Sequence, residues 1–154
     1  MINVNFDDAV AYCNWLSAKT GKIYRLPTES QWEYAARGGN KSYGYTFSGS
    51  DDLEIVGWYE SNSGRQTQPV GGKNPNELGL YDMSGNVLEW CRDWFGEYNV
   101  GPQTDPQGSL SGEFRILRGG CWYNTPVECR LTYRSFNGPA SRFNDAGFRV
   151  IRLQ

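Results

Sequence analysis

Histidine is absent from this chain of 154 residues. Histidine is the most common general base near neutral pH and the most common transition-metal ligand, because its pKa lies close to neutrality. Its absence excludes Ser-His-Asp triads, histidine-ligated zinc and non-haem iron triads. Any chemistry of this chain must therefore use other side chains.

The given sequence also shows no long apolar run, no basic stripe and no recognisable signal peptide. No apolar run approaches the roughly 20 residues that span a bilayer, so we expect no membrane insertion. The net charge is -2, with acidic and basic residues interspersed, which argues against a nucleic-acid partner. Residues 1–8 have neither the basic nor the apolar stretch of a signal peptide, so localisation stays open.

Glycine and aromatic residues are abundant, with 19 glycines and 15% aromatics. This composition predicts long, ordered loops held by large side chains, because disordered chains are poor in aromatics. The length predicts a single domain over residues 1–154, which would bury roughly two-thirds of the unfolded chain's surface.

Four cysteines are present, and their spacing matches no zinc or redox motif. Two interpretations of their role stay open. They can be buried small hydrophobic residues, as free cysteines often are. Alternatively, Cys129 can form a disulfide with Cys121 or with Cys91, since the sequence alone does not give connectivity. The four are Cys13, Cys91, Cys121 and Cys129.

Two helices are predicted near the N-terminus. The first covers residues 5–19, with Asn5 as its cap and Gly21 as its stop. The second begins at a capping box, Thr28 to Gln31, and ends at residues 38–39.

Short strands are predicted later in the chain, at residues 87–91, 114–118 and 147–151. Residues 40–79 and 99–112 show no periodicity and are predicted to be loops. Helices followed by scattered strands indicate an α+β fold.

Six motifs, in order along nearly the whole chain, resemble those of the formylglycine-generating-enzyme-like (sulfatase-modifying factor) domain family. This resemblance implies a C-type-lectin-like fold with two helices, a small antiparallel sheet and long ordered loops. The motifs lie at residues 8–15, 24–29, 32–39, 79–90, 117–120 and 147–149.

The family contains several functional classes, so the fold alone does not give the function. One class is a copper-dependent oxidase, whose motif has two cysteines five residues apart. Cys129 matches the second, but Asn124 stands where the first would be. A rearranged pair of Cys121 and Cys129 remains an alternative, because soft sulfur ligands select Cu(I). Another class, the iron-dependent sulfoxide synthases, needs three histidines and is excluded.

The class that fits best is the ligand-binding variable proteins diversified by retroelements, which resemble this chain over residues 121–145. Diversification rewrites adenines, mostly in Asn codons, and cannot produce Met, Trp, Gln, Lys or Glu. Between residues 123 and 145, outside the fixed-looking positions, only Glu128 falls outside the reachable set. The predicted ligand-binding residues are Tyr123, Asn124, Thr125, Val127, Glu128, Leu131, Thr132, Tyr133, Ser135, Phe136, Asn137, Ala140, Ser141, Phe143, Asn144 and Asp145.

The aromatic residues of this region have two interpretations: an exposed contact patch or a satellite core beneath the loops. We favour the patch, because polar and small residues flank each ring. Arginines are interpreted instead as scaffold that pairs with loop carbonyls and carboxylates, with Glu89 or Asp93 as partners. These arginines are Arg130, Arg134, Arg142 and Arg149.

A tight turn at residues 82–87 has two interpretations. Resemblance to the family implies a structural calcium ion, bound by Asp82 and by the carbonyls of Met83, Gly85 and Val87. The alternative is a turn held by an Asx hydrogen bond.

Together these features predict a non-enzymatic ligand-binding protein that requires no cofactor. The partner would be an unknown protein or surface ligand. The chain itself would be displayed on a virion or on a bacterial cell surface. Its oligomeric state stays open. Two alternatives are the copper oxidase and a structural or regulatory family member with a fixed loop.

Overall fold

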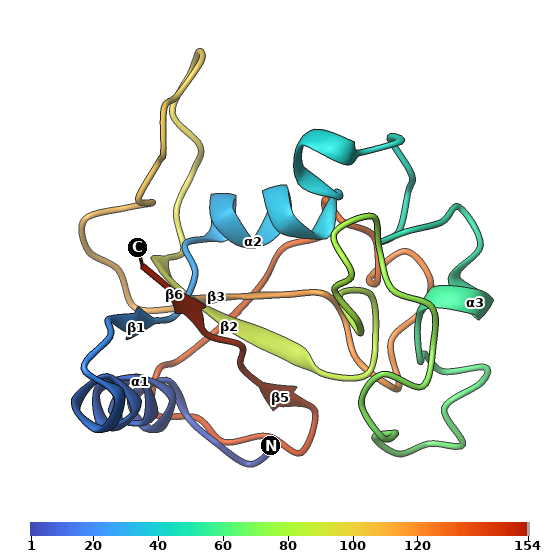
Figure 1. Ribbon diagram of the computed structural model, residues 1–154, viewed down its shortest axis with the longest axis horizontal. Coiled ribbons are helices and arrows are strands. Elements are labelled where there is room, and N and C mark those ends of the chain that lie inside the picture. The colour runs from blue at the N-terminus through green and yellow to red at the C-terminus, as the bar shows by residue number, and fades with distance from the viewer. Residues whose placement is uncertain (154) are drawn as a thin grey trace.

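The computed structural model describes residues 1–153 and has the α+β architecture that the sequence predicts. Helix α2 packs on strands β2 and β3, while α1 lies beside β1 at one end of the molecule (Figure 1). Long loops fill the other end. The elements are α1 (Phe6–Thr20), β1 (Tyr24–Arg25), α2 (Glu29–Ala36), η1 (Gly39–Lys41), α3 (Leu53–Val56), β2 (Leu88–Trp94), β3 (Arg115–Arg118), β4 (Ser135–Asn137), β5 (Ala146–Gly147) and β6 (Ile151–Arg152).

Both predicted helices are confirmed, and both begin with a capping box. The Asn5 side chain accepts the Asp8 N–H at 2.8 Å, and the Asp8 carboxylate accepts the Asn5 N–H at 3.1 Å. Thr28 and Gln31 make the same reciprocal pair at the start of α2. Helix α1 ends at Gly21, whose φ of 69° favours glycine.

The main sheet has the strand order β4-β3-β2-β5. Strands β2, β3 and β4 are antiparallel, but β5 runs parallel to β2, so the sheet is mixed. The predicted closing strand at residues 147–151 is divided, because β5 pairs with β2 whereas β6 pairs with β1 in a separate two-stranded sheet. The chain changes partner within that short run, and the alternation of its side chains does not reveal the change.

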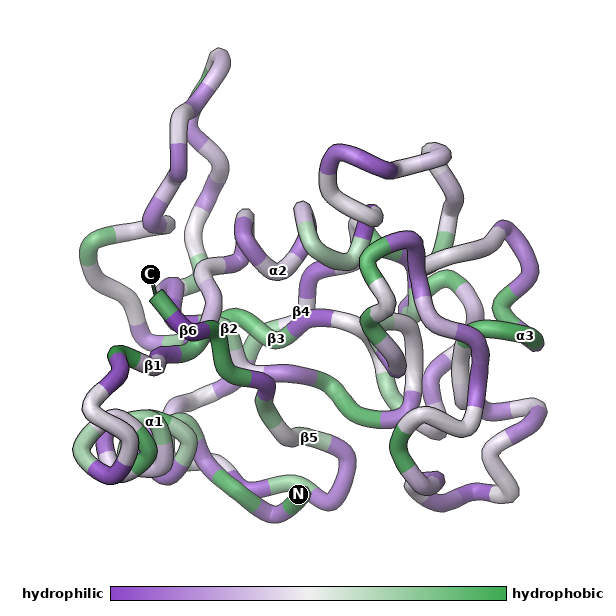
Figure 2. The backbone as a smooth tube through the Cα atoms, viewed as in Figure 1, coloured by the Kyte–Doolittle hydropathy of each residue, from purple (hydrophilic) through white to green (hydrophobic). Residues whose placement is uncertain are grey.

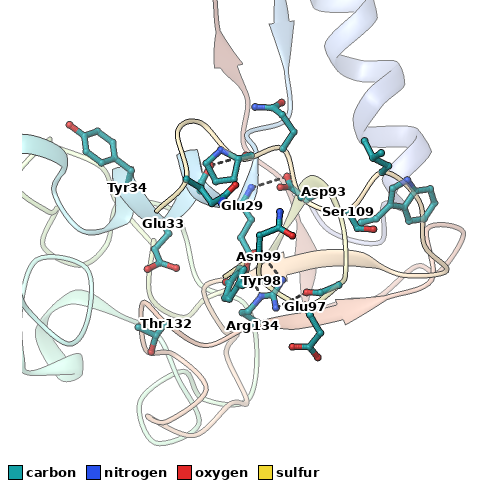
Figure 3. A pocket seen from close by; sticks show the side chains of 18 of the residues that line it. Glu29, Glu33, Tyr34, Asp93, Glu97, Tyr98, Asn99, Ser109, Thr132 and Arg134 are labelled. Atoms are coloured by element: carbon teal, nitrogen blue, oxygen red, sulfur yellow. Dashed lines mark hydrogen bonds and ion pairs between the residues drawn. The ribbon is translucent and has the colours of Figure 1, made fainter. Parts of the chain in front are cut away.

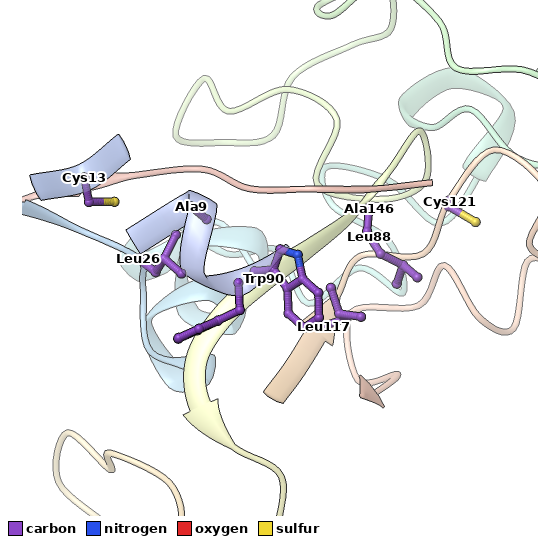
Figure 4. Packing of buried hydrophobic residues seen from close by; sticks show 9 residues of the cluster. Ala9, Cys13, Leu26, Leu88, Trp90, Leu117, Cys121 and Ala146 are labelled. Atoms are coloured by element: carbon purple, nitrogen blue, oxygen red, sulfur yellow. The ribbon is translucent and has the colours of Figure 1, made fainter. Parts of the chain in front are cut away.

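The main core surrounds Trp90, which is fully buried on β2 (Figure 4). The Phe6 ring of α1 meets the Trp90 ring edge to face, with centroids 6.2 Å apart. The Trp90 Nε1–H donates to the Val4 carbonyl at 3.2 Å, so the buried indole has its hydrogen-bond partner. A second cluster surrounds Trp32 on α2, and a third, around Phe47, lies under the loops.

The long loop at residues 40–79 contains two short helices, η1 and α3, which the sequence does not predict. It is fixed by the buried side chain of Asn76, whose Nδ2 donates to the Ala35 carbonyl at 2.8 Å and whose Oδ1 accepts the Leu80 N–H at 3.1 Å. The loop at residues 96–112 projects above α2 and is mostly hydrophilic (Figure 2). Ordered loops therefore frame one side of α2.

Candidate functional site

The C-terminal segment, residues 121–145, leaves β3 and is fixed to the turn at residues 82–87 and to the loop at residues 40–79. The Trp122 N–H donates to the Asn86 carbonyl at 3.0 Å, and the Ser63 hydroxyl donates to the Trp122 carbonyl at 2.7 Å. Further on, the Leu131 N–H donates to the Thr46 carbonyl at 3.2 Å. These bonds hold the backbone of the segment in one position.

Most of the predicted ligand-binding residues lie at the surface. Seven are exposed: Tyr123, Thr125, Val127, Thr132, Phe136, Ala140 and Asn144. Six others are partly exposed: Glu128, Tyr133, Ser135, Asn137, Ser141 and Phe143. The segment can therefore present many side chains on a fixed backbone.

Three of the predicted contact residues are buried, which corrects their placement on the surface. The Asn124 side chain turns inward because its Oδ1 accepts the Cys121 N–H at 2.9 Å. Leu131 packs into the core around Trp32. Asp145 is 5% exposed and accepts the Tyr123 hydroxyl at 2.6 Å. All three stabilise the segment.

The exposed aromatic rings of the segment contact different neighbours. Tyr123 meets the Trp122 ring edge to face at 4.9 Å. Phe136 lies on β4, a strand that the sequence does not predict, and meets Phe95 at 4.0 Å and Phe114 at 5.3 Å. Phe143 packs partly against the main core, as the satellite-core interpretation holds.

Three of the four predicted scaffold arginines make ion pairs. Arg134 pairs with Glu29, Arg142 with Asp8, and Arg149 with Glu89, the partner expected from the sequence. The other expected partner, Asp93, instead accepts the backbone N–H of Glu29 at 2.9 Å. Arg130 is exposed, and its side chain makes no hydrogen bond to residues 1–153, so its scaffold role is not supported.

All four cysteines are free and buried, which confirms their interpretation as small hydrophobic residues over the two disulfides. Burial raises the pKa of the Cys121 thiol to about 12 and that of Cys129 to about 12. Cys129 lies close to Cys121, but a copper-thiolate site fits this pair poorly, because both buried thiols hold their protons. Asn124 has no sulfur, and its amide is bonded within the fold. Among residues 1–153, no three His, Cys, Asp or Glu side chains lie close enough together to hold a metal ion.

Thiol labelling tests this arrangement. Ellman's reagent reacts with thiolates, and a buried thiol with a raised pKa supplies almost none. At pH 8 we expect no rapid labelling of the native protein and labelling of all four cysteines in guanidinium chloride. Rapid labelling of two native thiols, or fewer than four after unfolding, would contradict the structure.

The predicted calcium ligands share one turn, and one of them has a free carboxylate oxygen. Asp82 Oδ2 accepts the Gly71 N–H at 2.8 Å, whereas Oδ1 is buried without a hydrogen-bond partner among the described residues. Burial also raises the pKa of Asp82. The Gly85 carbonyl accepts the Val87 N–H at 3.0 Å, and Met83 is buried. Calcium at this turn therefore stays a prediction with partial support.

A large cavity, which the sequence does not predict, lies between α2 and the loop at residues 96–112 (Figure 3). We call it the α2 cavity; its volume is about 1030 Å³. The Ser30 hydroxyl of α2 donates to the Pro106 carbonyl at 3.2 Å and closes one side of it. Thr132 and Arg134 of the C-terminal segment reach the cavity from below. The only sequence feature that pointed to this cavity is the long predicted loop at residues 99–112. The other lining residues are far apart in the sequence and come together only in the folded structure.

Comparison with known proteins gives a consistent family. Residues 1–154 match the model of the sulfatase-modifying factor enzyme 1-like domain. The chain is 39% identical over 168 residues to the formylglycine-generating enzyme of Streptomyces coelicolor, covering 97% of this chain and 51% of that protein. It is also 39% identical over 146 residues to the chaperone protein LppX of Paenibacillus barcinonensis, covering 84% and 49% respectively. The chain thus spans about half the length of these curated relatives.

A solved structure, that of Treponema denticola variable protein 1, superposes closely on this chain. The TM-score is 0.90 with 34% sequence identity, over 97% of this chain and 69% of the other. The match bears out the C-type-lectin-like fold that the sequence motifs imply. No helix among residues 1–153 is both long and apolar enough to span a bilayer.

Proposed function

The chain belongs to the sulfatase-modifying factor enzyme 1-like domain family, and from that premise we propose that it is a non-enzymatic ligand-binding protein. Its contact surface is formed by the exposed residues of the C-terminal segment. Its ligand is a protein or another surface ligand. The scaffold it shares with the variable protein of Treponema denticola supports this proposal.

The observation that carries the proposal is the division of burial along the C-terminal segment. Cys129 is buried and Arg134 is paired with Glu29, so these fixed-looking positions hold the frame. Interleaved positions such as Thr125, Val127 and Thr132 point outward. Exchange of outward side chains leaves the frame intact, which is what a surface of variable specificity needs.

Two aromatic residues would anchor a ligand. Tyr123 is 49% exposed, and its ring is fixed because its hydroxyl donates to the buried Asp145. Phe136 is 43% exposed and rests on Phe95. Rigid aromatic rings give contact area at low entropic cost. We further propose that the residues of this surface are varied by retroelement-driven replacement of adenines in their codons. We also propose that the protein is displayed on a virion or on a bacterial cell.

Combined substitution of exposed residues tests whether the frame is independent of the surface. We expect Val127→Ala, Thr132→Ala and Asn144→Ala together to cost less than about 1.5 kcal/mol, since isolated surface changes each cost about 0.5 kcal/mol or less. Leu131→Ala, in the same segment but 2% exposed, should cost about 2–5 kcal/mol. Urea denaturation measures both. Equal losses would show that the outward residues belong to the fold.

A display library separates the proposal from the oxidase alternative. We expect randomisation of Tyr123, Thr125, Val127, Thr132 and Asn144 to give folded variants, some of which bind hen lysozyme when panned against it. A folded library without binders would contradict the proposal. The parent protein, incubated with Cu(I) and a cysteine-containing peptide, should form no aldehyde by mass spectrometry; aldehyde formation would establish the oxidase instead.

A further inference from the structure

The α2 cavity has a floor whose charges are already neutralised. The Glu29 carboxylate accepts from Arg134 Nε at 2.8 Å, Arg134 Nη2 at 2.9 Å and Arg118 Nη1 at 3.2 Å. Arg118 also pairs with Glu33, and it is fully buried. Glu29 and Glu33 therefore have their counter-charges within the protein, which reduces their attraction for a cationic ligand.

Tyr98 forms a fixed aromatic platform at the side of this floor (Figure 3). Its hydroxyl donates to Glu29 Oε1 at 3.1 Å, and the Arg134 guanidinium lies 4.0 Å from its ring centroid. The hydrogen bond to Glu29 fixes the hydroxyl end of the Tyr98 ring, and the Arg134 guanidinium covers one of its faces. Tyr98 is nevertheless 63% exposed, so the remaining ring surface is free to stack on a ligand.

Neutral hydrogen-bonding groups surround the platform. Asn99, Gln103, Gln107 and Thr132 line the cavity and offer both donors and acceptors. Asp93 is buried beside them, and its Oδ2 accepts the Glu29 N–H at 2.9 Å. Burial raises the pKa of Asp93. The lining thus suits hydroxyl groups, which both donate and accept.

The charge of the lining selects among ligand classes. Carboxylates outnumber guanidinium groups there, so phosphate or another anion would be repelled. Cationic ligands gain little, because Glu29 and Glu33 are already paired. Asp93 is buried and accepts the Glu29 N–H, and Glu97 is exposed to water, which screens its charge. The ligand that remains has one apolar face and many hydroxyls. We propose that the α2 cavity binds a neutral saccharide, whose pyranose face stacks on Tyr98.

A glycan array probed with the intact chain tests this assignment, followed by calorimetric titration of bound neutral oligosaccharides. We expect Tyr98→Ala to weaken binding about tenfold, because it removes the stacking platform. Tyr98→Phe keeps the ring but loses the bond to Glu29, so its loss should be about threefold or less. Tyr43→Ala, which removes another exposed tyrosine that lies outside the cavity, should leave binding unchanged.

Each other outcome overturns the assignment. Binding of acidic glycans alone, binding of a hexalysine peptide in place of saccharides, or no neutral glycan bound would each exclude this ligand class. Neutral glycans bound equally by the Tyr98→Ala variant would place the site elsewhere. Melting temperatures of the variants show whether any loss comes from unfolding. Tyr123→Ala should leave saccharide binding unchanged, so failure here and failure of the C-terminal binding surface are distinguishable.

Discussion

Replacement of Arg118 by alanine is expected to lower the free energy of unfolding by about 3–5 kcal/mol, because it breaks a buried ion-pair network and leaves two carbonyl groups without their donor. Arg118 is fully buried on β3. Its guanidinium pairs with Glu29 and Glu33 and donates to the carbonyls of Tyr133 and Leu131. The loss would be a large part of the stability of a domain of this size.

Arg142→Ala is the matched control. Arg142 also makes an ion pair, with Asp8, but its side chain is 51% exposed. Water replaces an exposed partner, so we expect a loss of less than about 1 kcal/mol. Arg118→Lys should fall between these values, because lysine keeps the charge but cannot reach four acceptors with one fork. Guanidinium denaturation measures all three. Equal losses for Arg118→Ala and Arg142→Ala would show that the buried network contributes little.

Local features of the fold could be predicted from the sequence. The N-terminal cap of a helix depends on two side chains only three residues apart, such as Asn5 and Asp8 in α1. A short sequence pattern is therefore enough to predict where the helix begins. The strand at residues 115–118 could be recognised from its short run of apolar residues between charged ones, although three consecutive positions of it are buried instead of alternating. Exposure within the C-terminal segment was also mostly predictable from its residue types.

Features that depend on distant contacts could not be predicted. Glu29 and Arg134 are 105 residues apart, and nothing local marks them as partners. That pair joins the C-terminal segment to α2 at the floor of the α2 cavity. The inward turn of Asp145 depends likewise on Tyr123, 22 residues away. Asn124 turns inward to a partner only three residues away, Cys121, but its polar residue type does not reveal that bond. The sequence places Arg118 in a family motif, but its charge network appears only in the structure.

Gly85→Ala is expected to cost about 3 kcal/mol or more beyond the ordinary cost of alanine at a positive φ. Gly85 has φ 84°, and its N–H donates to the Gly119 carbonyl at 2.7 Å, just before the C-terminal segment. A Cβ at this position would overlap the Trp58 carbonyl oxygen and lie 2.9 Å from its carbon. These are backbone atoms, so no side-chain rotation relieves the clash.

Gly79→Ala separates this clash from backbone strain. Gly79 has nearly the same φ, 77°, but nothing lies within 4 Å of the Cβ position. We therefore expect Gly79→Ala to cost only about 1 kcal/mol, the penalty of the left-handed conformation. Because Gly85 connects the loop beside Trp58 to the base of the C-terminal segment, its substitution should also expose the cysteines of that segment to Ellman's reagent. Equal stability of the Gly85→Ala and Gly79→Ala variants would show that the loop at Trp58 moves away from Gly85 without cost. The backbone beneath the C-terminal segment would then be less rigid than its hydrogen bonds imply.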